Sequence, residues 1–138
     1  MEALELHEKS KATFIQALGH DHVNVAMSHH KIAGIYSNQG KYVEALELYE
    51  KSKAIRIQVL GHDHADVAKS YEGTAITYER QGKYVEALEL YEKSKAIRIK
   101  AFGHDHVDVI RTCNKIADVY EAQGLPEKAR IARRNLPA

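Results

Sequence analysis

The chain has little of the residues that interrupt helices or cross-link a fold. Its 138 residues include two prolines, one cysteine and no tryptophan. So few prolines favour long helices, because proline breaks a helix interior. A single cysteine, Cys113, excludes an internal disulfide, and this predicts a reducing, cytoplasmic location. No apolar run approaches the ~20 residues that cross a bilayer, so no membrane association is expected.

The sequence also lacks an excess of charge of either sign. Twenty Lys and Arg residues balance nineteen Asp and Glu residues, which leaves a formal net charge of +1. Proteins that bind nucleic acid by neutralising many phosphates are strongly basic, so nucleic acid is not expected as a partner. The opening stretch, MEALELHEKSK, is acidic and amphipathic, unlike the basic start of a secretory signal.

The most prominent feature of the sequence is a long internal repeat. The stretch GKYVEALELYEKSKAIRI occupies residues 40–57 and recurs unchanged at 82–99. The same pattern divides the chain into units of 42 residues, at 2–43, 44–85 and 86–127. Such periods are typical of stacked repeats, in which one unit cannot bury its apolar side alone. We therefore predict one array that covers residues 1–138.

Each unit is predicted to form two helices joined by short turns. In the middle unit, apolar residues recur at spacings of three and four over 43–60 and again over 63–82. Asp63 is expected to cap the start of the later helix with Asp66 as its partner, and Gly82 to end it. Short joints require antiparallel neighbours. The fold class is therefore all-α, a row of helical hairpins.

The two ends of the array are expected to differ. Residues 2–18 predict a helix of the second type without its hairpin partner, and residues 126–135 a shorter, polar closing helix that begins with Pro126. The first helix would leave apolar side chains uncovered, among them Leu4, Leu6, Phe14 and Ile15. We therefore expect either a fragment of a longer array or a homo-oligomer that forms through this uncapped helix.

The repeated residues resemble those of the tetratricopeptide repeat (TPR) family. A small residue is followed by an aromatic three positions on at Ala33 and Tyr36, Ala75 and Tyr78, and Ala117 and Tyr120. A turn glycine precedes an aromatic at Gly40 and Tyr42, and at Gly82 and Tyr84. The usual alanine of the second helix is replaced by serine at Ser10, Ser52 and Ser94.

The 42-residue period is similar to that of the kinesin light chain subclass of this family. The resemblance implies a right-handed superhelical solenoid of antiparallel hairpins with about seven helices. It also implies a protein–protein interaction scaffold that binds a peptide or a partner segment in a concave groove lined by the first helices of successive units. Function does not follow from fold alone, so the residues of that groove must carry the argument.

Helical periodicity places a set of polar and charged side chains in that groove. The expected partner-binding residues are His30, Lys31, Asn38, Lys69, Glu72, Ile76, Arg80, Arg111, Asn114, Lys115 and Asp118, with Met27, Gly34, Gly73 and Ala122 beside them. The copies diverge most at these positions, whereas the second helices stay nearly fixed. This contrast favours a variable binding face, although any exposed helix face can drift. The basic members favour a peptide that carries acidic residues.

Two alternatives to peptide binding follow from the same residues. The array could be a structural spacer or a self-associating piece with no peptide ligand of its own. The HDH triplets at 20–22, 62–64 and 104–106 could bind a metal adventitiously, although structural joints explain them better. Cys113 is expected to be a buried core residue. No catalytic or phosphate-binding motif is present, so neither enzymatic activity nor a cofactor is expected.

Overall fold

The computed structural model describes residues 2–18 and 22–134, and these form helices and no strand. The helices are α1 (Glu2–Leu18), α2 (Val23–Asn38), α3 (Tyr42–Leu60), α4 (Ala65–Arg80), α5 (Tyr84–Phe102), α6 (Val107–Ala122) and α7 (Pro126–Arg133). This confirms the predicted all-α solenoid of seven helices. The closing helix ends at Arg133, and residue 135 lies outside the described part. Over the described residues, no helix has the length and hydrophobicity that a membrane crossing requires.

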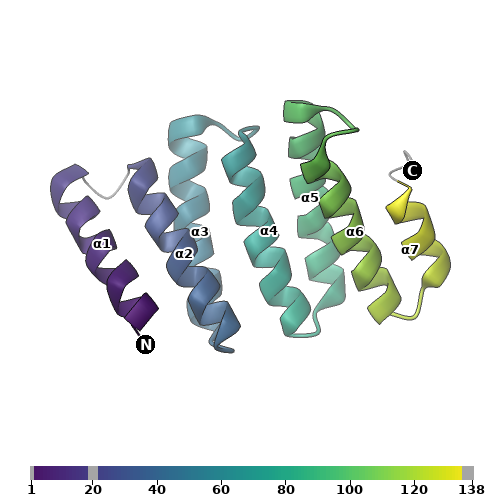
Figure 1. Ribbon diagram of the computed structural model, residues 1–138, viewed down its shortest axis with the longest axis horizontal. Helices are drawn as coiled ribbons and strands as arrows, with labels where there is room; N and C mark the ends of the chain where they lie inside the picture. The colour runs from purple at the N-terminus through teal and green to yellow at the C-terminus, as the bar shows by residue number, and fades with distance from the viewer. Residues whose placement is uncertain (1, 19–21, 135–138) are drawn as a thin grey trace.

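The helices stand side by side in one row from α1 to α7 (Figure 1). Consecutive helices run antiparallel, and α2, α4 and α6 form the nearer layer in this view, with α3 and α5 behind them. The layer of α2 and α4 is also joined directly, because the Thr77 hydroxyl donates a hydrogen bond to Ser37 Oγ at 3.0 Å. The helices α2, α3 and α4 meet at what we call the first junction, and α4, α5 and α6 meet at the second junction.

The core is built from alanines and tyrosines at equivalent places in the repeat. Ala45 and Ala87, the small residues near the start of the second helices, have no exposed surface. The aromatics four residues on, Tyr49 and Tyr91, are 5% and 0% exposed. Small side chains let neighbouring helices approach closely, and each tyrosine lies between two first helices. Identical sequence therefore places an alanine and a tyrosine at the same positions of both junctions.

The turn after α4 shows why the predicted helix ends are correct. The amide of Lys83 donates to the carbonyl of Tyr78 at 2.9 Å, and the amide of Gly82 donates to that of Glu79 at 2.9 Å. This pair of bonds is the Schellman motif, which requires a positive φ at the residue after the cap. Gly82 has a φ of +76°, a conformation that glycine adopts without steric cost.

The predicted cap at the start of α4 is wrong, because His64 and not Asp63 caps the helix. His64 Nδ1 accepts a hydrogen bond from the backbone amide of Asp66 at 3.0 Å. Asp63 lies one residue too early to reach that amide, and its carboxylate pairs with Lys100 instead. His22 and His106 cap α2 and α6 in the same way. An imidazole nitrogen thus replaces the side-chain oxygen that usually caps helices.

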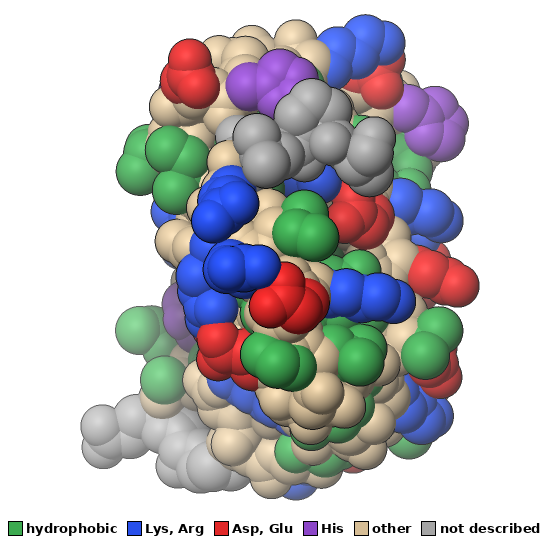
Figure 2. Space-filling model, turned by 90° about the vertical axis from the view of Figure 1, so that its right-hand side faces the viewer, with side chains coloured by type: hydrophobic (Ala, Val, Ile, Leu, Met, Phe, Trp, Pro, Cys, Tyr) green, Lys and Arg blue, Asp and Glu red, His purple; other side chains and the backbone are tan. Residues whose placement is uncertain are grey.

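The two ends of the row differ in what they expose. At the end formed by α6 and α7, charged side chains lie among apolar ones (Figure 2). Arg133 joins α7 to α6 through ion pairs with Asp118 and Glu121. At the other end, Leu6 on α1 is 64% exposed. The side chains of Phe14 and Ile15, which were expected to be uncovered there, lie outside the described residues.

Candidate binding groove

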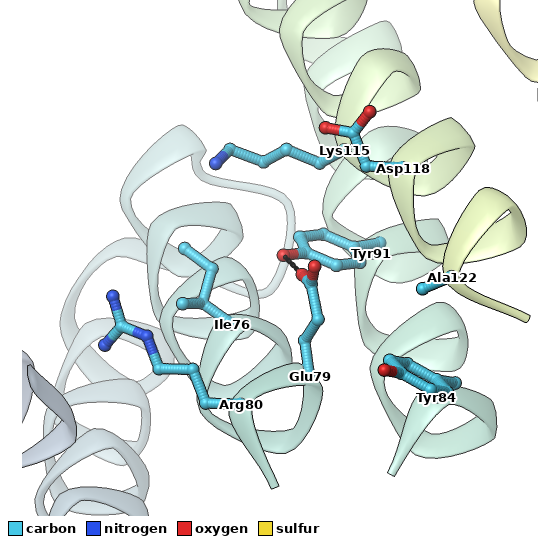
Figure 3. Close-up of a pocket in the computed structure, with 8 residues that line it drawn as sticks. All are labelled: Ile76, Glu79, Arg80, Tyr84, Tyr91, Lys115, Asp118 and Ala122. Atoms are coloured by element: carbon cyan, nitrogen blue, oxygen red, sulfur yellow. Dashed lines mark hydrogen bonds between the residues drawn. The ribbon is translucent and has the colours of Figure 1, made fainter. Parts of the chain in front are cut away.

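The first helices α4 and α6 border a pocket whose floor is α5. It has a volume of about 410 Å³ (Figure 3). Its lining consists of Ile76, Glu79, Arg80, Tyr84, Tyr91, Lys115, Asp118 and Ala122. Five of these residues come from the groove face that the sequence predicted. Glu79, Tyr84 and Tyr91 were not predicted. The two tyrosines lie on α5, a second helix, whereas the predicted groove consists of first helices; Glu79 lies on the first helix α4 but outside the face that the periodicity indicated.

The floor of this pocket is held by a hydrogen bond between two of the missed residues. The Tyr91 hydroxyl donates to Glu79 Oε1 at 2.8 Å (Figure 3). Burial raises the pKa of Tyr91 above its usual value, and the hydrogen bond with Glu79 raises it further. Tyr91 therefore stays protonated and keeps donating, and the Glu79 carboxylate has a partner within the protein.

The charged side chains around the pocket differ in whether they already have an ion-pair or hydrogen-bond partner within the protein. Asp118 Oδ1 lies 3.0 Å from the Arg133 guanidinium, and Arg80 donates to Ser37 Oγ at 2.8 Å. Lys115 has no acidic partner within 4.0 Å in the described part of the chain, and it extends from α6 toward α4 (Figure 3). Neither Arg80 nor Lys115 thus has an acidic partner within 4.0 Å in the described residues, and Lys115 also lacks a hydrogen-bond partner there, so its ammonium group is open to a ligand beside an aromatic and aliphatic floor.

A tyrosine ring fills the first junction, whereas the second junction holds the pocket. The ring of Tyr49, the copy of Tyr91, lies directly against the Cα of Gly73: a Cβ added there would come within 2.3 Å of Tyr49 Cε1. The hydroxyl of Tyr49 also lies within 3.5 Å of where a Cβ on Gly34 would be. Gly73 is buried, so the expectation that it lines the groove is wrong. It instead makes room for a tyrosine.

The other predicted groove residues spread along the first helices. Lys31 lines a pocket of about 260 Å³ between α1 and α2, together with Met27 and His7. Asn38 and Asn114 are exposed. Two basic side chains near the starts of their helices form exposed ion pairs: Lys69 with Asp66 at 3.7 Å, and Arg111 with Asp108 at 3.2 Å.

His30 and Glu72 occupy equivalent positions in the repeat and contact equivalent arginines. The His30 ring packs edge-on against Tyr49 at a centroid distance of 5.1 Å, and its Nδ1 lies 3.3 Å from the Arg56 guanidinium. Glu72 forms an ion pair with Arg98. Arg56 and Arg98 are 5% and 2% exposed. This burial was not predictable from the sequence, because basic residues late in a helix usually lie in solvent, where they stabilise its carbonyl end.

Neither of the reactive residue types in the chain forms a site in the described residues. Cys113 is 2% exposed, and burial raises the pKa of its thiol, which disfavours the thiolate that a nucleophile requires. His20 lies outside the described residues. Over the remainder, no group of three or more His, Cys, Asp or Glu side chains is placed to hold a metal ion.

A family model and solved structures indicate the same family for this chain. A model described as "Tetratricopeptide repeat" matches residues 25–100 and again residues 75–132. A search of curated protein sequences finds no match.

Solved structures share the arrangement of the helices. The nearly identical TPR-like repeats of a predicted kinesin light chain from Podosopora anserina are 30% identical, with a TM-score of 0.80 over 95% of this chain and 62% of theirs. BtubC (BKLC) from P. vanneervenii is 22% identical, with a TM-score of 0.84 over 96% of this chain and 54% of its own. MamA is 18% identical, with a TM-score of 0.63 over 96% of this chain and 75% of its own. The chain thus spans less than two thirds of the length of the first two.

Proposed function

Because the chain belongs to the tetratricopeptide repeat family, whose fold serves as a protein-interaction scaffold, we propose that it binds a peptide segment of a partner protein in the groove of α2, α4 and α6. The observation that carries this proposal is the pocket of about 410 Å³ at the second junction. Its floor comes from the repeated helix, whereas its walls come from the helices that differ between copies. A constant frame with a variable lining is what a binding face requires.

The charges of the groove favour a ligand with acidic residues. Its carboxylates already have partners within the protein: Asp118 pairs with Arg133, and Glu79 accepts from Tyr91. Lys115 is not engaged in this way. An acidic side chain of the ligand would therefore gain a partner there without displacing an existing one. An ionised hydrogen bond of this kind is about twice as strong as a neutral one.

A library of random peptides displayed on phage tests the proposal. The 138-residue chain is used as bait beside two variants with the same change of charge. Lys115→Glu reverses the uncommitted charge in the pocket. Lys51→Glu reverses an exposed charge on α3, outside the groove. We expect Lys115→Glu to lose the enriched peptides and Lys51→Glu to keep them, with the same helical circular dichroism in all three proteins. Equal enrichment by both variants would contradict binding in this pocket.

Self-association is a second candidate, and one observation favours it. Leu6 is 64% exposed on α1, at the N-terminal end of the row. In this case, sedimentation of the wild type would show an oligomer that grows with concentration, and Leu6→Lys would return it to the monomer. A wild type that stays monomeric at millimolar concentration would exclude this candidate.

A further inference from the structure

A further pocket, which we call the α7 pocket, has a volume of about 240 Å³ and lies among α5, α6 and α7. Lys95 of α5, Cys113 and Tyr120 of α6, and Ala132 of α7 are among the residues that line it. Cys113 and Tyr120 lie on the side of α6 opposite to Lys115, because a helix turns by about 100° per residue. The α7 pocket shares no lining residue with the pocket at the second junction, so it is separate from the groove.

The repeat shows what occupies the corresponding place in the earlier units. The position of Cys113 carries an aromatic ring in both of them, His29 in the first unit and Tyr71 in the second. The Tyr71 ring packs against a buried cluster that includes Ile97 of α5. In the third unit the side chain is that of a cysteine, and α7 has eight residues where α5 has nineteen. The α7 pocket therefore corresponds to a place that a ring fills in the middle unit.

The surroundings of the Tyr71 ring are repeated at the α7 pocket. Lys53 lies over that ring, with its Nζ 5.1 Å from the ring centroid, and it also forms an ion pair with Glu50 at 2.9 Å. Lys95, the copy of Lys53, forms the same ion pair with Glu92 at 3.3 Å. The ion pair thus leaves the lysine of each copy in place to contact a ring by a cation–π interaction.

The size and the lining of the α7 pocket suit one aromatic ring. An apolar cavity of about 150 Å³ takes up benzene, so 240 Å³ is enough for the ring of a tyrosine or phenylalanine. Cys113 and Ile116 are each 2% exposed, whereas Ile131 is 49% exposed. A ring that enters would therefore pack on buried apolar side chains and cover part of an exposed one.

We propose that the α7 pocket binds an aromatic side chain of a partner protein, which inserts beside Lys95 as the Tyr71 ring lies beside Lys53. A protein is the expected source of the ring, because the chain belongs to a family of protein-interaction scaffolds and aromatic side chains seated in pockets are common anchors of protein interfaces. The inference goes beyond the proposed function and does not depend on it. The array would then bind partners at two separate faces.

The repeat also supplies the variants for a test. Cys113→Tyr installs the ring of the middle unit and should fill the pocket. Ala132→Leu fills it from α7 with the residue that α5 has at the same position, Leu90, and it replaces Cys113→Tyr if that variant does not fold. Tyr71→Cys makes the reverse change and should open an equivalent pocket in the middle unit. Cys113→Ala is the matched control, because it removes the thiol without filling the space. Retained helical circular dichroism checks the fold of each variant.

The first measurement uses p-cresol, the side chain of tyrosine as a free molecule, and follows the backbone amide signals by NMR. In the wild type we expect p-cresol to shift the signals of α6 and α7 around the pocket, and Cys113→Ala should keep this binding. Cys113→Tyr and Ala132→Leu should lose it, and Tyr71→Cys should gain a second set of shifts around residue 71. Absence of shifts at the pocket in the wild type, or equal binding by the filled variants, would overturn the site.

A non-aromatic probe of the same shape tests whether the pocket prefers a ring with a π system. We expect 4-methylcyclohexanol to bind about two- to fivefold more weakly than p-cresol, because it makes no cation–π contact with Lys95. Equal affinity for the two probes would mean that the pocket takes any apolar group, and the assignment to an aromatic side chain would be wrong.

The second measurement asks whether the ring belongs to a protein. In a selection of displayed random peptides, those that Lys115→Glu keeps and Cys113→Tyr loses are expected to share a tyrosine or a phenylalanine. Replacing that residue with alanine should weaken binding about tenfold, as is typical of an aromatic anchor. If p-cresol binds the pocket while Cys113→Tyr enriches every peptide as well as the wild type does, the site takes a small aromatic molecule, and its assignment to a partner protein is wrong.

Discussion

Replacing Gly73 with alanine tests whether Tyr49 fills the first junction as tightly as the structure shows. The added Cβ would lie 2.3 Å from Tyr49 Cε1 and 2.6 Å from its Cζ, against a favourable carbon–carbon separation of about 3.5–4.0 Å. The ring is 5% exposed, so it cannot turn out into solvent without losing its packing. Overpacking of this kind, which forces side chains off their rotamers or shifts backbone, costs about 1–3 kcal/mol.

Gly34, the other glycine that faces Tyr49, provides the control. Gly34→Ala places its Cβ 3.5 Å from Tyr49 Oη, an ordinary contact. Alanine is favoured over glycine in a helix by about 1 kcal/mol, a gain that both variants share. We therefore expect Gly34→Ala to be more stable than wild type by about 0.5–1 kcal/mol, and Gly73→Ala to be less stable by about 1–2 kcal/mol.

Urea unfolding followed by circular dichroism at 222 nm measures both variants. Tyr49→Leu supplies the cross-check, because a smaller side chain leaves room for the new methyl group. In that background Gly73→Ala should cost nothing, so a double-mutant cycle should show a coupling of about 1 kcal/mol or more. If Gly73→Ala alone is as stable as Gly34→Ala, the tyrosine does not fill the junction and the difference between the two junctions is unfounded.

Three further predictions follow from side chains that repeat along the chain. Ser52→Ala should lower the free energy of unfolding by about 1 kcal/mol, measured in urea, because the Ser52 hydroxyl donates a hydrogen bond to a carbonyl of α2 at 2.8 Å. Ser94→Ala should leave the free energy of unfolding unchanged or raise it, because the Ser94 hydroxyl is buried without a hydrogen-bond partner. His64→Ala should lower the free energy of unfolding by about 1 kcal/mol, whereas Asp63→Ala, which loses an exposed ion pair, should stay within about 0.5 kcal/mol. Burial lowers the pKa of His30 to about 4, so the unfolded chain takes up a proton there at a higher pH than the folded chain. The free energy of unfolding should therefore be highest above pH 6.5 and fall by up to about 3 kcal/mol as the pH drops to about 4. His30→Asn should remove this pH dependence.

The fold was predictable from sequence because its determinants are local and repeated. The 42-residue period, the spacing of apolar residues and the glycines of the turns specify where helices begin and end, as the Schellman motif at Gly82 illustrates. The capping residue was not predictable from preference alone. Aspartate is the commoner cap, yet the helix begins one residue later than that preference suggests, and His64 is the side chain in reach.

The site was less predictable because it depends on contacts between units. Periodicity placed Ile76, Lys115 and Asp118 on one face, and the structure brings them to one pocket. It could not show that Gly73 lies beneath a tyrosine, since that depends on which rotamer Tyr49 adopts across the junction. Nor could it show that Arg56 is buried, because a basic residue near a helix end has the same pattern whether it faces solvent or a neighbouring helix.

Nearly identical second helices nevertheless build two different junctions. The stretch 40–57 equals 82–99 residue for residue, and α3 and α5 differ only in their last three residues, so Tyr49 and Tyr91, like Arg56 and Arg98, lie in identical segments. The cause must lie in the first helices that pack on them. Where such a helix offers a glycine, the tyrosine fills the junction; where it offers Lys115, a pocket remains. Under the proposed function, the first helices would determine which peptide binds, whereas the copied second helix serves the stacking of the repeats.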